Sequence, residues 1–196
     1  MEGGVSMHNK PQIKLIFIVF ASCLLIFSPL LILLIPLFFP VTFFYEKYTW
    51  VYYTPSINHL LIGIAIGLLF LACLTVLLIK NFKIMLSIAS ILTIGAIILT
   101  VGSSVSYLKI TSDGMKLRHP FEMKEAVYKW DELEKVDYYP ILYGTGNAKY
   151  EVTFKDGKSF EFSENGGVLI IRSKLKMVLL QHDVPYRNMS TGLQIK

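Results

Sequence analysis

The stretch YLKITSDGMKLRHPF, residues 107–121, marks the change of pattern on which the fold depends. Its first part alternates the apolar residues Leu108 and Ile110 with polar or aromatic neighbours, which is the period of a β-strand with one buried face. SDG (112–114) is a tight-turn signal, because Gly114 can adopt a positive φ. MKLRHPF then reads as the returning strand. The stretch therefore predicts a β-hairpin that opens a small β domain.

The chain before this hairpin carries very little charge. Of the 19 Lys and Arg residues in the 196-residue chain, five precede residue 109, and of the 14 Asp and Glu residues, two do. The chain thus divides near residue 108 into an apolar part and a charge-rich part. The second part interleaves both signs and has no basic stripe, so nucleic-acid binding is not expected.

Three apolar segments predict membrane spans at about 15–39, 60–79 and 84–106, within a transmembrane region of 15–108 that follows a short tail, 1–14. Roughly 20 apolar residues are enough to cross the hydrocarbon core. The run from Leu15 to Tyr45 holds no charged residue and is expected to cross once, bent by three prolines. A re-entrant hairpin over 15–45 is the alternative.

The second and third spans are separated only by KNFK (80–83), which predicts an antiparallel helical hairpin. Gly63 and Gly67 form a small-xxx-small pair that we expect in the packing face of this hairpin. EKYTWVYYTPSINH (46–59) is rich in Tyr and Trp and is interpreted as a membrane-surface loop with interfacial aromatic residues.

The part after the first hairpin predicts further strands at 124–130, 133–143, 148–154 and 159–164, which gives about six antiparallel strands. An amphipathic helix follows, in which Val168, Ile171, Leu175 and Val178 recur at helical spacing. The predicted fold class is an α-helical anchor of three transmembrane helices with a C-terminal small antiparallel β barrel or sandwich, closed by one capping α-helix. The predicted domain covers 107–186, and 187–196 is a tail.

The turn and core residues of this domain resemble a known family. Thr111, Asp113 and Gly114 end the first strand, and Trp130, Asp131, Glu132, Leu133 and Val136 lead into a later one. This pattern resembles the bacterial pleckstrin-homology-like (PH-like) domains of small multi-pass membrane proteins, over residues 105–186. The resemblance implies a binding or scaffolding role without shared catalytic residues. In the commonest arrangement of the family two spans precede the domain, whereas three are predicted here.

No pattern in the chain predicts an active site. His119 and His182 lack a neighbouring nucleophile, DELE (131–134) reads as a surface turn, and HExxH, CxxC and P-loop strings are absent from the sequence. Cys23 and Cys73 lie in apolar runs and read as small hydrophobic residues. We therefore predict no catalytic, cofactor-binding or metal-ligating residue, no cofactor and no enzyme. Candidate contact surfaces are the open strand edges and the loops 112–114, 144–147 and 155–157.

These features favour an integral membrane protein of the bacterial plasma membrane whose PH-like domain binds a protein partner or lipid headgroups. It would act as an accessory or scaffold subunit. The alternative is a regulatory subunit of a transporter or channel that works through its transmembrane helices. The lysines that flank the spans favour a cytoplasmic N-terminus, with Lys10, Lys14, Lys80 and Lys83 inside. Three spans then put the β domain outside, although the family resemblance favours the cytoplasm.

Overall fold

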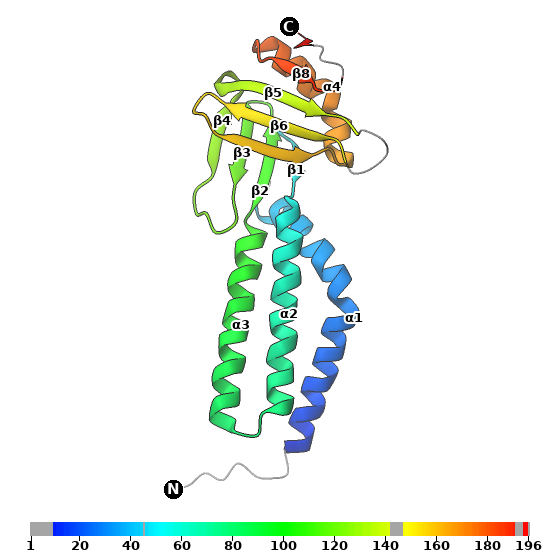
Figure 1. The fold of residues 1–196 in the computed structure, drawn as a ribbon, viewed down its shortest axis with the longest axis vertical. Coiled ribbons are helices and arrows are strands. Elements are labelled where there is room, and N and C mark those ends of the chain that lie inside the picture. The colour runs from blue at the N-terminus through cyan, green and yellow to red at the C-terminus, as the bar shows by residue number, and fades with distance from the viewer. Residues whose placement is uncertain (1–9, 45, 142–146, 191–193, 196) are drawn as a thin grey trace. The chain divides into compact units, whose positions relative to one another are not determined.

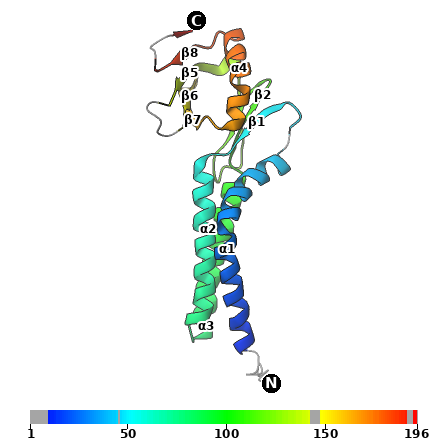
Figure 2. The ribbon, with the colours of Figure 1, turned by 90° about the vertical axis from the view of Figure 1, so that its right-hand side faces the viewer.

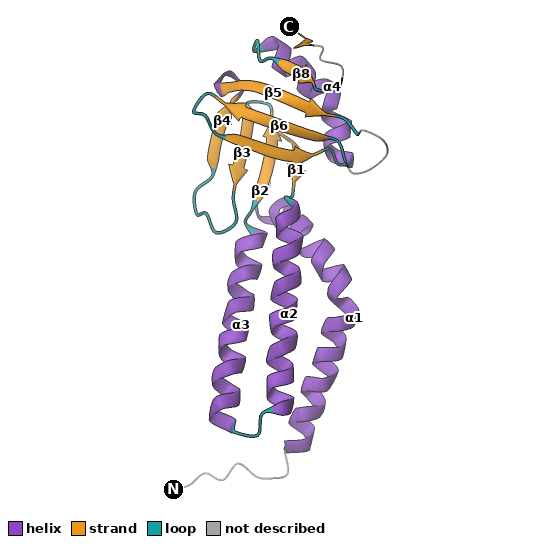
Figure 3. Ribbon diagram, viewed as in Figure 1, coloured by secondary structure: helices purple, strands orange, loops and turns teal. Residues whose placement is uncertain are grey.

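The computed structural model describes residues 10–44, 46–141, 147–190 and 194–195. The chain forms two compact units. The first comprises residues up to Phe39 together with Ser56–Val105, and the second comprises Pro40–Pro55 together with the residues from Ser106 onward. The first unit is helical and the second holds the strands (Figure 3).

The helical unit confirms three apolar helices long enough to cross a membrane. They are α1 (Lys10–Phe43), α2 (Ser56–Leu78) and α3 (Phe82–Ser104), of which α2 and α3 lie side by side as an antiparallel hairpin (Figure 1). The last residues of α1, from Pro40, belong to the second unit. α1 is one continuous helix of 34 residues, so the alternative of a hairpin within 15–45 is wrong.

At Pro29 and Pro36 of α1, other groups replace the missing backbone donors. A proline has no N–H, so the carbonyl four residues earlier loses its helical partner. The Ser28 hydroxyl donates to the Leu25 carbonyl at 2.9 Å, which compensates for Pro29. The Nδ1 atom of His59, in α2, lies 2.9 Å from the Ile32 carbonyl, which compensates for Pro36. These contacts satisfy polar groups that lipid cannot.

Small residues pack the helices, but not as the sequence predicted. A Cβ at Gly95 of α3 would lie 3.4 Å from the Leu68 side chain of α2. A Cβ at Gly63 would instead come nearest to Ile32 of α1, at 3.8 Å, and one at Gly67 would meet no atom within 4 Å. The prediction that Gly63 and Gly67 pack the α2–α3 hairpin is therefore wrong, whereas Gly95 of α3 does face α2.

The first sheet of the second unit has the order β1-β2-β3-β4, all antiparallel. Its strands are β1 (Thr49–Tyr53), β2 (Tyr107–Thr111), β3 (Gly114–Arg118) and β4 (Ala126–Lys129). The predicted hairpin is confirmed as β2–β3, and Gly114 has a φ of +154°.

Strand β1 corrects the reading of residues 46–59 as a surface loop. Residues 49–53 lie between α1 and α2 in the sequence and pair with β2, where Tyr53 is opposite Leu108. Val51 and Tyr53 are buried in the core of the β unit, and the Tyr53 hydroxyl accepts a hydrogen bond from the Ser163 N–H at 3.1 Å. The segment between α1 and α2 is thus a structural part of the C-terminal domain.

The second sheet has the order β7-β6-β5-β8-β9. A 3-10 turn, η2 (Trp130–Glu132), precedes it, and its strands are β5 (Leu133–Tyr139), β6 (Lys149–Phe154), β7 (Ser159–Ser163), β8 (Tyr186–Asn188) and β9 (Gln194–Ile195). β8 runs parallel to β5, with Val136 opposite Tyr186. The expectation of antiparallel strands only was wrong here, and so was the reading of 187–196 as a tail.

The last helix, α4 (Gly166–Gln181), begins at Asn165, whose side chain accepts from the Val168 N–H at 3.0 Å. It buries Val168, Ile171, Leu175 and Leu179 in a core shared by both sheets. The helix also packs against β1, seen beside it in Figure 2, where a Cβ on Gly167 would lie 3.1 Å from Val51. Among the described strands no sheet closes into a barrel: two sheets and one helix enclose the core.

Candidate functional site: an ion-pair network around Lys109

Lys109 is the most unusual charged residue of the β unit, because its side chain is only 3% exposed. A lysine in an alternating strand is expected to point to water, and fully buried lysines are rare unless they are paired. Here all five residues of β2 are buried. The segment between α1 and α2 covers the face of β2 that would otherwise be wet.

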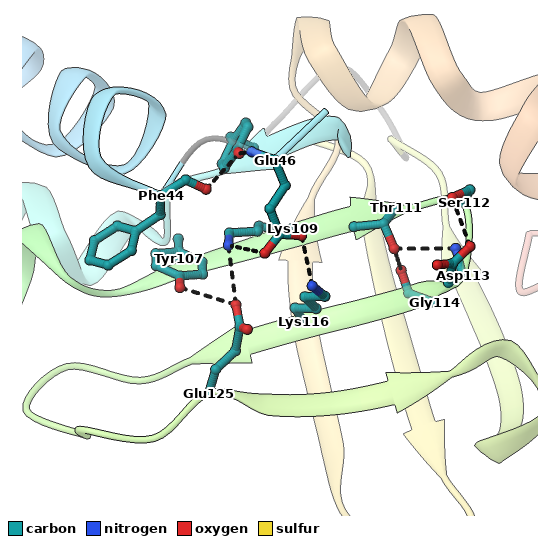
Figure 4. A network of polar contacts seen from close by, with 11 residues as sticks. Phe44, Glu46, Tyr107, Lys109, Thr111, Ser112, Asp113, Gly114, Lys116 and Glu125 are labelled. Carbon is teal, nitrogen blue, oxygen red and sulfur yellow. Dashed lines mark hydrogen bonds and ion pairs between the residues drawn. The ribbon is translucent and has the colours of Figure 1, made fainter. Parts of the chain in front are cut away.

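Two carboxylates neutralise the Lys109 ammonium. Its Nζ atom lies 3.1 Å from Glu46 Oε1 and 3.3 Å from Glu125 Oε1 (Figure 4). The other oxygen of Glu46 accepts from Lys116 Nζ at 2.7 Å, and the Tyr107 hydroxyl donates to Glu125 at 3.0 Å. Two cations therefore face two anions. We call Glu46, Tyr107, Lys109, Lys116 and Glu125 the Lys109 network.

Aromatic residues close the Lys109 network on its other side. The ammonium of Lys109 lies 4.7 Å from the ring centre of Tyr107 and 6.0 Å from those of Phe44 and Tyr52, within range of cation–π attraction. The Tyr52 hydroxyl donates to the Phe44 carbonyl and accepts from the Glu46 N–H, both at 2.8 Å. The residues after α1 are thereby fixed in the conformation that presents Glu46 to β2.

The charges shift the pKa values in the direction expected of stable ion pairs. Burial lowers the pKa of Lys109, but the hydrogen bond to Glu46 and the charge of Glu125 outweigh it, so this pKa lies above its usual value. The hydrogen bond from Lys116 is the largest influence on Glu46 and holds the pKa of its carboxyl below the usual value. Burial, followed by the charge of Glu125, raises the pKa of the Tyr107 hydroxyl.

This arrangement binds one part of the chain to another. Each member of the Lys109 network already has a partner within the chain. The Lys109 network therefore attaches the segment between α1 and α2 to the β2–β3 hairpin.

The Lys109 network was missed in the sequence, although one signal was available. The predicted hairpin places Lys109 directly opposite Lys116, which the structure confirms. Like charges opposite each other in a sheet are unfavourable, so the pair requires an anion nearby. Glu46 supplies it from 63 positions away, a separation at which sequence alone names no partner.

A second polar cluster lies between β5, β6, β8 and α4. Tyr138 and Tyr150 both donate to Glu164, at 3.4 and 2.8 Å, and Glu164 forms an ion pair with Arg172 at 3.4 Å. Arg172 also donates to the Tyr138 hydroxyl. Burial raises the pKa of Tyr186, the third tyrosine of the cluster, to about 12. Tyr138 and Tyr150 act as hydrogen-bond donors to the Glu164 carboxylate.

The histidines and turns singled out in the sequence have structural contacts. His119 packs edge-on against Phe160, and Nδ1 of His182, at the end of α4, lies 2.5 Å from Asp131 of DELE. That hydrogen bond is the largest influence lowering the pKa of Asp131. In loop 112–114, Asp113 N–H and the Gly114 carbonyl both bond to the Thr111 hydroxyl. Most of loop 144–147 lies outside the described residues.

The outer side of α4 is apolar as well as its inner side. Leu169, Ile170, Met177 and Leu180 are exposed, and Ile170 keeps 84% of its surface in contact with solvent. At 100° per residue these four positions lie on the helix side opposite the buried stripe. Several large apolar side chains exposed on one side of a helix are typical of an interaction surface.

The described residues hold no cluster of three or more His, Cys, Asp or Glu side chains that could bind a metal ion. The two cysteines are free. No protein-family model matches this chain, and no curated protein matches it either.

Proposed function

We propose that the chain is a non-enzymatic integral membrane protein of the bacterial plasma membrane whose β unit, a PH-like domain, acts as a scaffold for a protein partner. The motif around Thr111–Gly114 and Trp130–Val136 supports the PH-like assignment. Two sheets and a terminal helix that share one core are compatible with it. The chain would serve as an accessory subunit rather than as a catalyst.

The observation that carries this proposal is the number of short connections between the spans and the β unit. The chain passes between them at Phe43–Thr49, at Tyr53–Ser56 and at Ser104–Tyr107. Because an extended residue spans only about 3.3–3.6 Å, connections this short would hold the β unit near the surface of the membrane that the proposed spans cross. Such a domain is suited to present a surface to partners that are themselves at the membrane.

The exposed apolar side of α4 is the surface we assign to the protein partner. Helices with an exposed apolar side pack into a groove or against another helix of a partner. The test places a photo-crosslinking residue at Ile170 in the full chain in native membranes, with Lys158 of the exposed β6–β7 turn as the control position. We expect one discrete protein adduct from position 170 and none from 158.

A second variant decides whether that adduct reports docking. Met177→Glu, on the same side of α4, is expected to abolish the adduct, whereas Lys174→Glu leaves it in place. Adducts from both positions alike, or no protein adduct at either, would contradict the scaffold proposal.

A second candidate function works through the helices. An apolar groove of about 700 Å³ lies between α1 and the α2–α3 hairpin, lined by residues that include Phe17, Cys73, Met85 and Ala89. Such a groove can accept an apolar helix of a transporter or channel, which the chain would then regulate. Ala89→Trp should fill the groove and release such a partner while Ile170→Glu has no effect. The opposite result favours the scaffold.

For orientation we propose a cytoplasmic N-terminus, supported by Lys14, Lys80 and Lys83 beside the spans. Because β1 pairs with β2, the α1–α2 segment and the C-terminal domain share one side of the membrane. Single cysteines at Lys47 and Lys158, with Cys23 and Cys73 replaced by Ser, should both react with an impermeant maleimide on intact cells. If both cysteines are protected until lysis, the orientation is the reverse of the one proposed. If the cysteines at 47 and 158 give different results, the pairing of β1 with β2 is contradicted.

A further inference from the structure

The β3–β4 loop, residues 119–125, exposes two large apolar side chains. Met123 is 91% exposed and Phe121 is 53% exposed. Lys124, also exposed, lies beside Met123. Glu122, which stands between Phe121 and Met123, is exposed as well. Apolar side chains with charged neighbours suit a segment at a lipid–water interface, where the charged groups stay at the headgroups.

The backbone of the loop holds Phe121 outward in a conformation that the residue does not favour. Phe121 has a φ of +66°, in the left-handed region, directly after Pro120. The Glu122 N–H bonds to the His119 carbonyl at 3.2 Å, which closes the turn. Glycine or asparagine is the usual residue at this place in a turn after proline. A phenylalanine there is strained, and such strain is found where a side chain has a task.

Both ends of the loop are fastened beside the residues that join the β unit to the spans. Arg118 pairs with Tyr107 in the β2–β3 register, and Tyr107 follows the end of α3 at Ser104 by three positions. The guanidinium of Arg118 lies 5.4 Å from the ring centre of Phe44, the residue after α1. At the other end Glu125 accepts from Tyr107 at 3.0 Å.

The end of α1 exposes further apolar side chains within the β unit. Val41 and Phe43, in the last turn of the candidate span, belong to the same compact unit and are exposed. Phe44, the next residue, lies against the Arg118 guanidinium, which directly precedes the loop. Because the exposed side chains of a spanning helix face lipid, a loop that begins beside the end of such a helix is suited to meet the same lipid.

We infer that the 119–125 loop inserts Phe121 and Met123 into the interface of the bilayer that holds α1–α3, with Lys124 at the headgroups. The occupant of this surface is thus the lipid of the host membrane. The inference rests on the membrane location in the proposed function, and the test below separates the two.

The test measures the depth of a spin label in the full chain, reconstituted into vesicles of phosphatidylcholine and phosphatidylglycerol, with Cys23 and Cys73 replaced by Ser. Labels are placed singly at Met123, at Lys158 as the aqueous control, and at Ile91, an exposed residue of α3. We expect the label at 123 to collide more with lipid-soluble oxygen than with a water-soluble nickel complex, as at 91, and the reverse at 158.

Each outcome has one meaning. If position 123 behaves like 158 while 91 stays lipid-accessible, the loop inference fails and the membrane anchor stands. If 91 is also open to the nickel complex, the proposed membrane location fails. Phe121→Asn, which suits the left-handed backbone, should keep the fold and move the label at 123 toward water. An unchanged depth in that variant would contradict the role of Phe121.

Discussion

At the scale of single residues, Lys109 decides whether the segment between α1 and α2 stays on the β unit. Lys109→Met leaves the carboxylates of Glu46 and Glu125 without their buried cation. Breaking a buried pair costs about 3–5 kcal/mol. Because the Glu46 side chain is 38% exposed and is still bound by Lys116, we expect a loss of about 2 kcal/mol in the free energy of unfolding.

Chemical denaturation of the purified full chain in detergent, followed by tryptophan fluorescence, measures this loss. The matched control is Lys158→Met, which breaks the exposed pair with Asp156 and should change the free energy by less than about 0.5 kcal/mol. Equal effects of the two variants would show that the Lys109 network adds nothing to stability.

The lowered pKa of Glu46 predicts how the free energy of unfolding depends on pH. Its pKa is lower in the folded chain than its ordinary value of 4.5, so the unfolded chain binds more protons in this range. The stability that Glu46 contributes is present above pH 4.5 and is lost as the pH falls through the lower folded value. Unfolding experiments between pH 6 and pH 3 should show a smaller decline for Glu46→Gln than for the unchanged chain. A parallel decline in both would contradict the assignment.

Gly114 is a position where only glycine fits. A Cβ there would lie 2.0 Å from the Tyr128 carbonyl oxygen and 2.8 Å from Lys129 Cα, both backbone atoms. Gly114→Ala should therefore lower the free energy of unfolding of the β unit by about 3 kcal/mol, because the backbone is strained and neighbouring backbone atoms are displaced. Gly157→Ala is the control, because φ there is +82° and no atom lies within 4 Å. We expect its cost to be about 1 kcal/mol.

At the scale of elements, His59 holds α1 to α2 through the carbonyl that Pro36 deprives of its donor. Its Nδ1 atom must carry the proton for this bond, which fixes the tautomer of the ring. His59→Leu should weaken the association of α1 by roughly 1 kcal/mol. In a Pro36→Ala background, which restores a backbone N–H to the Ile32 carbonyl, the same change should cost almost nothing.

A double-mutant cycle over His59 and Pro36, measured by denaturation in mixed micelles, checks this coupling. Additive effects of the two changes would mean that His59 does not replace the missing donor.

The elements that the sequence predicted are those whose pattern is local. Apolar runs gave the three helices, and a glycine turn between alternating strands gave β2–β3. β1 was misread because Tyr and Trp suit both a membrane interface and a strand. The alternation of Val51 and Tyr53 with Trp50 and Tyr52 was the available signal.

The short strands β8 and β9 were missed because two or three residues carry no period of their own. In the Lys109 network, Lys109 lay within a predicted element, but its partner Glu46 comes from a segment before α2. A pairing between residues so far apart depends on the tertiary fold, which local patterns do not encode.

At the scale of the whole molecule, the β unit needs β1, a strand that α2 and α3 separate in sequence from the other strands of the unit. A fragment of residues 106–196 lacks Val51 and Tyr53, both buried in its core. We expect this fragment to expose apolar surface and to unfold without cooperativity. Joining residues 44–54 to Ser106 through a short Gly-Asn linker should restore the fold, because Tyr53 pairs with Leu108 and the junction is a hairpin.

Amide hydrogen exchange of the two soluble proteins measures the difference. The joined protein with Val51→Asp is the control, since a buried carboxylate should undo the gain. A fragment 106–196 that folds cooperatively by itself would contradict the requirement for β1.

The pairing of β1 with β2 also sets the order of events during biosynthesis. About fifty residues separate Tyr53 from Tyr107, so the ribosome makes β1 roughly 3–10 s before its partner exists. During that time α2 and α3 must enter the bilayer together, because insertion of only one of them would leave the two strands on opposite sides. A completed first sheet therefore excludes the insertion of one helix without the other. A chain that inserts wrongly leaves an unpaired, aromatic strand for the cell's proteases to find.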